Sequence, residues 1–325
     1  MPLNWQAVSE LLLEPYVEPH WAIDEWLVEG ESGLVIGEPK TYKSTLALDM
    51  AVSLATGTDF MGIYPVRTVS PVLFIQEENN MSILMPQLYQ LMERAGHGHQ
   101  ALRAVDTGFE KVWVPLEDAP ELPLYMSVRA GWQADKASMG MVVNKANEIG
   151  AGYVFIDPLY KINPSGFTQP DDVAPVLHTL STIENETDAS VVLVHHANKG
   201  NTAGGKRILG SQLIWAWGAN NIYIEKKTKT NGQKYLYVQR EFRGKPEPDD
   251  IHVRFEEDFH WDVEEAVVDA TGKAVGGRAS TGFGLWMDLM RSDDDFRNSS
   301  QTEQAARINV TPKTIYNWRQ KSGIK

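Results

Sequence analysis

Residues 37–45 read GEPKTYKST, between the apolar run 33–36 and the apolar-rich stretch 46–52. This order predicts a strand, a tight loop and a helix, and it matches the phosphate-loop pattern G-x-x-x-x-G-K-S/T at every position except one. In such loops, backbone N–H groups bind phosphate oxygens, the lysine reaches the outer phosphates, and the hydroxyl ligates Mg²⁺. The sequence therefore predicts binding and hydrolysis of a nucleoside triphosphate. The residues that would form the loop are Gly37, Glu38, Pro39, Lys40, Thr41, Tyr42, Lys43, Ser44 and Thr45.

The exception is Tyr42, which replaces the second glycine of the pattern. Glycine serves in such loops where φ is positive or where the backbone lies close to the ligand. Because tyrosine lacks this freedom, we expect the loop to turn differently or to carry strain. The alternative interpretation is an ordinary strand–turn–helix with a chance Lys-Ser pair, and the strand and helix signals on both sides favour the phosphate loop instead.

The composition limits the classes of protein that this chain can belong to. Its 325 residues suffice for one large domain, or for a large and a small one, and 42% hydrophobic residues support a full core. The absence of cysteine excludes a disulfide framework, thiol catalysis and cysteine metal sites, and it fits a cytoplasmic location. No apolar run approaches the roughly 20 residues that span a bilayer, and the N-terminal residues do not resemble a signal peptide. The net charge of −13 restricts any nucleic-acid contact to a local basic patch.

Strand and helix signals alternate along the first two thirds of the chain. Apolar runs at 71–75, 153–156 and 190–194 indicate buried strands, and the segments 44–55, 82–94, 137–149 and 173–187 indicate helices. The pattern predicts an α/β fold with a mainly parallel sheet flanked by helices. Residues 106–130 are expected to be irregular. Residues 220–225 and 234–239 flank Asn231-Gly232, which predicts a hairpin, and 251–261 would add an edge strand to this antiparallel extension.

Polar residues follow three of the predicted strands, at the sheet edge where open α/β proteins bind ligands. Glu78 is a candidate to orient or deprotonate an attacking water, Asp157 to hold the Mg²⁺ shell, and His196 to sense the terminal phosphate. Each has a simpler interpretation. The acidic pair 77–78 can be a solvated helix start, Asp157-Pro158 a plain turn, and the histidine pair 195–196 a rim pair or a metal site. Their occurrence together in one α/β pattern favours the catalytic interpretation.

Four segments together resemble the RecA-like ATPases of the plasmid RepA-type helicase group, which is related to the DnaB-type hexameric helicases. They read GEPKTYKSTLALDMAVSLATG, VLFIQEEN, YVFIDPLYKI and LVHHANKG, and the resemblance covers about residues 20–260. It implies a RecA-like fold, ATP and Mg²⁺ as ligands, and a homo-oligomer, a hexameric ring or a filament, in which a neighbour completes each site. By position in the motifs, Lys43 and Ser44 match the phosphate-loop pair, Glu78 the catalytic glutamate, Asp157 the metal-binding aspartate, and His196 the sensor.

The resemblance implies two further regions. Residues 197–212 form a glycine-rich, basic loop that would face a central channel and contact single-stranded DNA. Arg240 or Arg243 would act in trans on the terminal phosphate of a neighbouring subunit, because neither is expected to have a role within its own subunit. The alternatives are an ordinary surface loop and surface salt bridges. The DNA-binding candidates in the loop are Lys199, Lys206 and Arg207.

The last 25 residues hold five basic side chains against one acid, Glu303, although the whole chain is acidic. They resemble a helix-turn-helix, with one helix capped by Thr302 and a recognition helix at 311–321 capped by Thr311. A helix at 284–291 would complete a three-helix unit. The alternative is a pair of protein-docking helices. The side chains expected to face duplex DNA are Lys313, Thr314, Asn317 and Arg319.

The sequence thus predicts an ATPase core at 1–264, a linker at 265–283 and a small all-α DNA-binding tail at 284–325. The leading hypothesis is a DNA-dependent ATPase, an oligomeric helicase or motor in replication of a plasmid, phage or similar mobile element, with no membrane partner. The second hypothesis is a nucleotide-switched DNA-binding regulator or loader without unwinding activity. The third is a P-loop small-molecule kinase, which the basic loop and the basic tail make less favoured.

Overall fold

The short apolar segments of the chain form one sheet of nine strands, in the order β13-β12-β11-β10-β3-β9-β8-β4-β7. From β10 to β7, every neighbouring pair is parallel. The central strands β3, β4 and β8 are buried along their whole length, which explains their nearly continuous apolar sequences. The parallel strands are β3 (Gly33–Gly37), β4 (Val72–Gln76), β7 (Leu124–Val128), β8 (Tyr153–Asp157), β9 (Ser190–His196) and β10 (Asn220–Thr228).

This computed structural model describes most of the chain. The described residues are 6–13, 18–96, 102–106, 111–115, 122–163, 166, 169–197, 212–228, 232–255, 260–265, 286, 290, 294–307, 315 and 319. Among the helices within these ranges, not one is both long enough and apolar enough to cross a membrane.

Three antiparallel strands extend the sheet beyond β10. They are β11 (Lys234–Phe242), β12 (Ile251–Phe255) and β13 (Trp261–Glu265). The hairpin predicted around Asn231-Gly232 is confirmed by the pairing of β10 with β11. The prediction of one edge strand over 251–261 is wrong, since the chain pairs β12 back on β13. The expected antiparallel extension of a parallel sheet is therefore present and is one strand longer than the sequence indicated.

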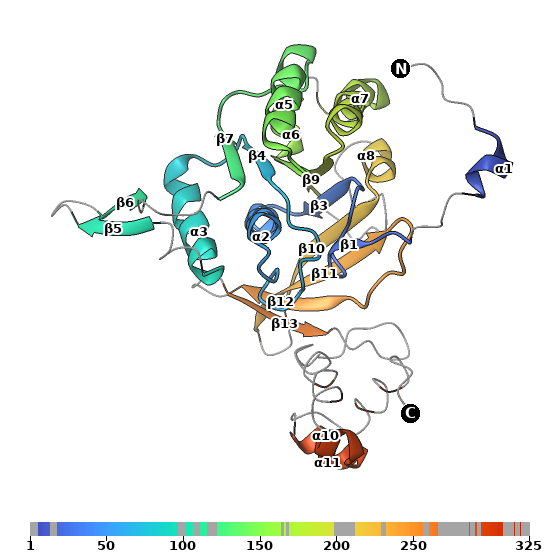
Figure 1. Cartoon of the computed structure of the whole chain (residues 1–325). Coiled ribbons are helices and arrows are strands. Elements are labelled where there is room, and N and C mark those ends of the chain that lie inside the picture. The colour runs from blue at the N-terminus through green and yellow to red at the C-terminus, as the bar shows by residue number, and fades with distance from the viewer. Residues whose placement is uncertain are drawn as a thin grey trace.

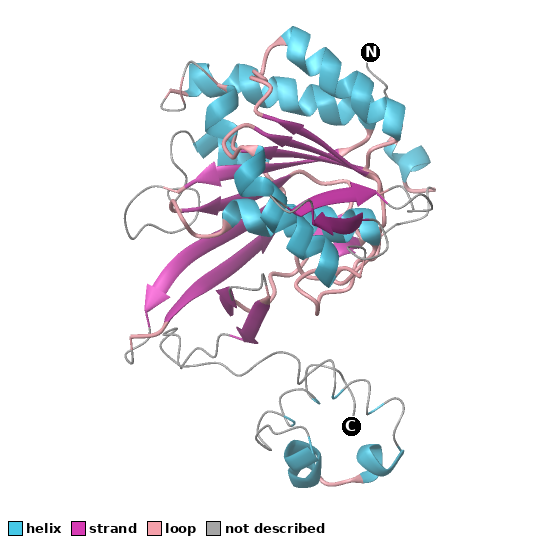
Figure 2. Ribbon diagram, turned by 90° about the vertical axis from the view of Figure 1, so that its left-hand side faces the viewer, coloured by secondary structure: helices cyan, strands magenta, loops and turns pink. Residues whose placement is uncertain are grey.

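Helices cover both faces of the sheet (Figure 1, Figure 2). On one face, α2 (Lys43–Thr56) and α3 (Met81–Arg94) share a buried apolar cluster with the antiparallel strands. The other face has a second cluster, formed with the helices α5 (Lys136–Ile149), α6 (Leu159–Ile162), α7 (Pro170–Thr187) and α8 (Gln212–Trp217). The predicted α/β class, with a mainly parallel sheet flanked by helices, is confirmed.

The expectation that residues 106–130 are irregular is wrong for two segments. One is β6 (Lys111–Pro115), which pairs antiparallel with β5 (Leu102–Asp106), and the other is β7 at the edge of the main sheet. Both contain the aromatic and β-branched residues that strands favour, but the prolines nearby obscured the pattern. Three short elements precede β3: α1 (Val8–Leu11), β1 (Trp21–Ile23) and β2 (Leu27–Val28).

Two short helices are described near the C-terminus, α10 (Asp294–Asn298) and α11 (Gln301–Arg307). The expected cap at Thr302 is wrong, because α11 begins at Gln301 and Thr302 lies inside its first turn. Ser300 caps it instead: the Glu303 N–H donates to the Ser300 hydroxyl (3.2 Å), and the Glu303 carboxylate accepts from the Ser300 N–H (2.8 Å). The predicted linker boundaries and recognition helix stay predictions, since residues 266–285 and most of 308–325 lie outside the described ranges.

The described part of the tail has a small core of its own. Trp286 and Phe296 are fully buried there, as is Ile315. The side chain of Gln304 is also buried; its carbonyl accepts from the Trp286 indole N–H (3.1 Å), and its amide donates to the Phe296 carbonyl (2.8 Å). These contacts join residues from both sides of α10 into one packed unit.

Candidate active site

The loop between β3 and α2 is closed by hydrogen bonds to a single carbonyl. The Lys43 ammonium and the Thr41 hydroxyl both donate to the Glu38 carbonyl oxygen, each at 2.8 Å. A side chain at Gly37 would have no space, because a Cβ there would lie 2.6 Å from the Thr41 hydroxyl and 2.7 Å from the Ile224 carbonyl. The first glycine of the phosphate-loop pattern is thus required by close packing against β10.

Tyr42 adopts the left-handed conformation that the missing glycine would have favoured, with φ of 60° and ψ of 23°. Of the two expected outcomes, the structure has the strained loop rather than a different turn. A non-glycine residue in this region costs about 1–3 kcal/mol, which surrounding contacts must offset. The Tyr42 ring packs on Phe255 of β12, with 4.5 Å between ring centroids, and this contact helps to hold the loop.

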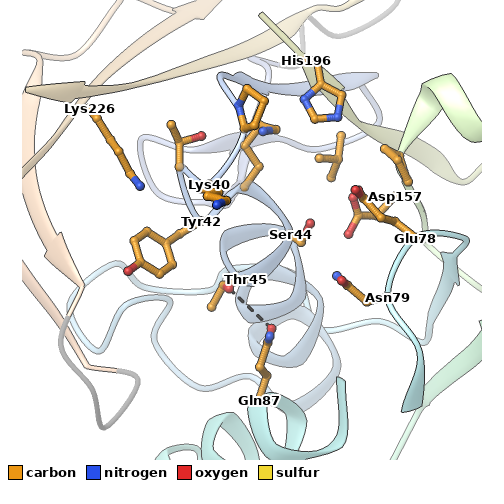
Figure 3. A pocket seen from close by; sticks show the side chains of 15 residues that line it. Lys40, Tyr42, Ser44, Thr45, Glu78, Asn79, Gln87, Asp157, His196 and Lys226 are labelled. Atoms are coloured by element: carbon orange, nitrogen blue, oxygen red, sulfur yellow. Dashed lines mark hydrogen bonds between the residues drawn. The ribbon is translucent and has the colours of Figure 1, made fainter. Parts of the chain in front are cut away.

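A cavity of about 530 Å³ opens above the N-terminus of α2 (Figure 3). Its volume lies within the usual range for small-molecule sites. It brings together residues from the ends of four strands and from two helices, including Lys43, Glu78, Asp157 and His196, all singled out from the sequence. The remaining lining residues are Pro39, Lys40, Thr41, Tyr42, Ser44, Thr45, Asn79, Gln87, Pro158, Val194 and Lys226.

The register of the parallel strands explains this convergence. In the pairing of β3 with β9, Gly37 lies opposite His196, and in that of β4 with β8, Gln76 lies opposite Asp157. Each of these residues ends its strand, so their side chains meet at one edge of the sheet. The Lys43 ammonium lies in this acidic surrounding, but burial dominates and lowers its pKa to about 8, against the opposing effects of Asp157, Glu78 and Glu38.

Asp157 is fully buried at the floor of the cavity. Burial raises the pKa of its carboxyl to about 6, and the nearby Ser44 hydroxyl and Gln76 amide limit the rise. Its Oδ2 accepts a 2.6 Å hydrogen bond from the Gln76 amide, whereas its Oδ1 has no hydrogen-bond partner among the described residues. A buried carboxylate oxygen left without a partner, next to a serine hydroxyl, fits the oxygen-rich shell that Mg²⁺ requires.

The two neighbouring glutamates have different surroundings. Glu77 turns away from the cavity, and its carboxylate accepts the backbone N–H groups of Gly131 (3.0 Å) and Trp132 (3.1 Å). Glu78 lines the cavity, and hydrogen bonding to it contributes to raising the pKa of the Tyr160 hydroxyl to about 12, after the larger effect of burial. Only Glu78 of this pair is placed to act on a molecule in the cavity.

Gln76 has a central part in this geometry that sequence reasoning missed. Its amide donates to Asp157, and its carbonyl oxygen accepts the backbone N–H groups of Glu78 (2.8 Å) and Asn79 (2.9 Å). One buried side chain therefore positions both Asp157 and the loop that bears Glu78. The signal in the sequence was a polar residue ending an otherwise apolar strand, directly before the acidic pair.

His196 lines the cavity from the end of β9. The centroid of its ring lies 5.0 Å from that of the Tyr160 ring. Burial lowers the pKa of the imidazole below its ordinary value, and the nearby Lys43 charge lowers it too. A neutral imidazole beside the phosphate loop suits a hydrogen-bonding sensor better than a fixed cation. Asn79, Gln87 and Lys226 also line the cavity and were not singled out from the sequence.

The two arginine candidates occupy different environments. Arg240 is buried, and its guanidinium lies 5.1 Å from the Trp26 ring and donates to the Glu25 carbonyl (3.4 Å). It therefore has contacts in its own subunit, contrary to expectation. Arg243 follows the end of β11, at the sheet edge opposite the phosphate loop, and it donates to the Ala216 carbonyl (2.8 Å) at an exposed position. Arg243 therefore also has a contact in its own subunit, and it differs from Arg240 in being exposed. The choice between the two as the arginine that acts on a neighbouring subunit stays a prediction.

Six of the seven DNA-binding candidates lie outside the described residues. They are Lys199, Lys206 and Arg207, together with Lys313, Thr314 and Asn317. Arg319 is described, in helical conformation. The roles of all seven candidates stay predictions.

Comparison with known proteins identifies the family of this chain. A family described as an AAA domain matches residues 2–202. A KaiC-like protein from the hyperthermophilic archaeon Pyrococcus horikoshii OT3 has a similar structure, with a TM-score of 0.49 and 15% identity over 76% of this chain and 97% of that one. The search of curated proteins gave no match. The family match covers more than half of the chain and includes the phosphate loop, Glu78, Asp157 and His196. The protein therefore belongs to the family described as an AAA domain.

Proposed function

We propose that the protein binds ATP with Mg²⁺ in the cavity above α2 and hydrolyses it. The observation that carries this proposal is the convergence of Lys43, Ser44, Glu78, Asp157 and His196 in one cavity of about 530 Å³. A chance phosphate-loop pattern would not be accompanied by these groups at the ends of neighbouring strands. The unpartnered Oδ1 of Asp157 and the adjacent Ser44 hydroxyl are the groups that would hold the ion.

Each residue has a defined part in this reaction. On phosphate binding, the Lys43 ammonium leaves the Glu38 carbonyl and neutralises charge on the outer phosphates. Glu78 orients and deprotonates the attacking water, and His196 hydrogen-bonds to the terminal phosphate. When bound, Mg²⁺ supplies charge stabilisation at the bridging and terminal phosphate oxygens. Gln76 and Tyr160 position Asp157 and Glu78 without contacting the nucleotide.

We further propose that turnover is coupled to DNA in a homo-oligomer, as a helicase or motor in replication of a mobile element. Support comes from the basic composition of residues 197–212 and of the tail, together with the exposed position of Arg243 at the sheet edge away from its own phosphate loop. An arginine there is available to the site of a neighbouring subunit.

The second candidate is a nucleotide-switched regulator or loader of DNA. The strained Tyr42 favours it. A loop whose conformation costs free energy can adopt one conformation with nucleotide bound and another without it. Strand separation distinguishes the two. A motor unwinds a forked duplex only with ATP and loses this activity in Lys43→Ala, whereas a regulator binds the same fork in a nucleotide-dependent way without unwinding it.

The tail requires its own experiment. Deleting residues 301–325 would remove Gln304 and Ile315 from the packed unit that includes Trp286, so lost DNA binding would be ambiguous. Charge reversal by the pair Lys313→Glu and Arg319→Glu keeps Gln304 and Ile315 in the chain. We expect weaker duplex binding with a smaller salt dependence and unchanged DNA-free ATP turnover. Unchanged duplex affinity would make the tail a protein-docking element.

A further inference from the structure

The replacement of glycine by Tyr42 places an aromatic ring at the mouth of the phosphate cavity. Tyr42 is 42% exposed, although it carries a large aromatic side chain. Figure 3 shows Tyr42 and Lys226 on one side of the α2 N-terminus and Glu78, Asp157 and His196 on the other. The groups suited to the terminal phosphate thus lie at the end of the cavity away from Tyr42.

A second cavity, of about 350 Å³, adjoins the first on the Tyr42 side. The two cavities share Tyr42 and Lys226. The other lining residues come from β11, β12 and the loop before β11; they are Gln233, Lys234, Tyr235, Leu236, Val253, Arg254 and Phe255. The combination of aromatic rings and aliphatic side chains with an amide and cations differs from the polar phosphate cavity. It is the surface that a flat, heteroaromatic group prefers.

The aromatic wall of this second cavity is anchored in the core. Ring centroids are 4.5 Å apart between Tyr42 and Phe255 and 4.6 Å apart between Phe255 and Trp261. The Trp261 indole N–H donates a 2.6 Å hydrogen bond to the buried Asp49 carboxylate of α2. The row therefore fixes the Tyr42 ring to β12, β13 and the phosphate-loop helix, so that an exposed ring is held in one position.

We propose that the Tyr42–Phe255 pair is the stacking wall of a nucleobase site, and that it gives this protein a preference for purine nucleotides over bare polyphosphate. The proposal rests on the proposed binding of a nucleoside triphosphate at the phosphate loop. The phosphate chain runs from Glu78 and His196 toward Lys226, and the base lies against the two rings. The strain at Tyr42 is then offset in part by a contact that exists only when nucleotide is bound.

A purely structural role for the ring accounts for less of what is observed. A residue kept only to stabilise the fold would bury its ring, and glycine or asparagine would satisfy the left-handed backbone with less strain. Lys226 adds to the case, because its ammonium lies 5.5 Å from the centre of the Tyr42 ring and lines both cavities. A cation at this junction can contact a phosphate while the ring contacts the base.

The test compares two ligands in the full-length protein: MgATP, which has a base, and inorganic tripolyphosphate with Mg²⁺, which has none. The variants are Tyr42→Gly, which restores the common loop, Tyr42→Phe, which keeps the ring, and Phe255→Leu, which removes the second ring. Tyr125→Leu, on β7 and outside both cavities, is the matched control for loss of an aromatic. Dissociation constants are measured by titration calorimetry.

Wild-type protein is expected to bind ATP about 10-fold more tightly than tripolyphosphate, as expected for one stacked base. In Tyr42→Gly and Phe255→Leu this ratio falls toward unity while tripolyphosphate binds as in the wild type or better. Tyr42→Phe keeps the wild-type ratio of the two dissociation constants. Equal losses for both ligands, or an unchanged ratio in Tyr42→Gly, would overturn the base site and leave Tyr42 as a loop residue. Failure of the wild type to bind either ligand would overturn the phosphate-loop assignment, and this inference with it.

Discussion

The Gln76 side chain donates a 2.6 Å hydrogen bond to the Asp157 carboxylate across the neighbouring strands β4 and β8. The same side chain accepts the backbone N–H of Glu78, so the two acids that serve different ends of the proposed reaction are coupled through one amide. A buried polar group with every partner satisfied fixes its neighbours in one arrangement. The geometry of the site therefore depends on a residue that is not expected to contact the nucleotide.

Replacing this amide tests its positioning role. Gln76→Leu removes a donor from the buried Asp157 and an acceptor from two backbone N–H groups. We expect the free energy of unfolding to fall by about 1–3 kcal/mol and kcat to fall more than the affinity for ATP. Chemical denaturation and steady-state kinetics measure the two effects. A stability loss with kcat unchanged would restrict Gln76 to a structural role.

The adjacent glutamates provide a matched pair of variants. Glu78→Gln should keep ATP binding and lower turnover roughly 10²- to 10⁴-fold, as for loss of a general base. Glu77→Gln should keep turnover within a few-fold of the wild type and lower the melting temperature, because its carboxylate accepts two backbone N–H groups away from the cavity. The reverse pattern would transfer the catalytic role to Glu77.

The pKa of Lys43 predicts a pH dependence of nucleotide binding. Burial lowers this pKa to about 8 in the protein without nucleotide, and bound phosphates favour the charged ammonium. Above pH 8, Lys43 must therefore take up a proton when ATP binds. Because this proton becomes scarcer as the pH rises, the affinity for ATP should fall as the pH rises through 8. Lys43→Arg, whose charge persists, should lose this step even if it binds more weakly. Titration calorimetry between pH 6.5 and 9.5, in buffers of different ionisation enthalpy, measures the proton uptake.

Glu184 on α7 predicts a pH dependence of stability away from the site. Burial raises the pKa of its carboxyl from an ordinary 4.5 to about 7, against the Val191 backbone hydrogen bond. The folded protein therefore binds this proton more tightly than the unfolded chain, and the group costs stability as the pH rises from about 4.5 through 7. Glu184→Gln should have a higher melting temperature than the wild type at pH 8, with the difference shrinking toward pH 5.

Thermal unfolding of Glu148→Gln provides the control for that prediction. Glu148 lies on the neighbouring helix α5 in an exposed pair with Lys145. Its loss should give a small difference in melting temperature that does not grow with pH above 7. A difference in melting temperature between Glu184→Gln and the wild type that is constant with pH would contradict the raised pKa of the half-buried Glu184 carboxyl.

The local signals of the sequence predicted the strand ends, the phosphate loop and the class of fold, because each of these depends on a contiguous stretch of residues. Gln76 was missed because its role depends on the register between β4 and β8, which no local pattern encodes. The burial of Arg240 was likewise invisible, since Trp26 and Glu25 lie more than 200 positions away in the chain. Strand β7 was obscured because it is a half-buried edge strand that follows a proline-containing segment.

The most direct test of the central claim is ATP hydrolysis by the full-length protein, measured with and without single-stranded DNA beside Lys43→Ala and Glu78→Gln. We expect Mg²⁺-dependent turnover that DNA stimulates, no ATP binding by Lys43→Ala, and binding without turnover by Glu78→Gln. Turnover that persists in both variants, or tight ATP binding by Lys43→Ala, would contradict the assignment of this cavity as the active site.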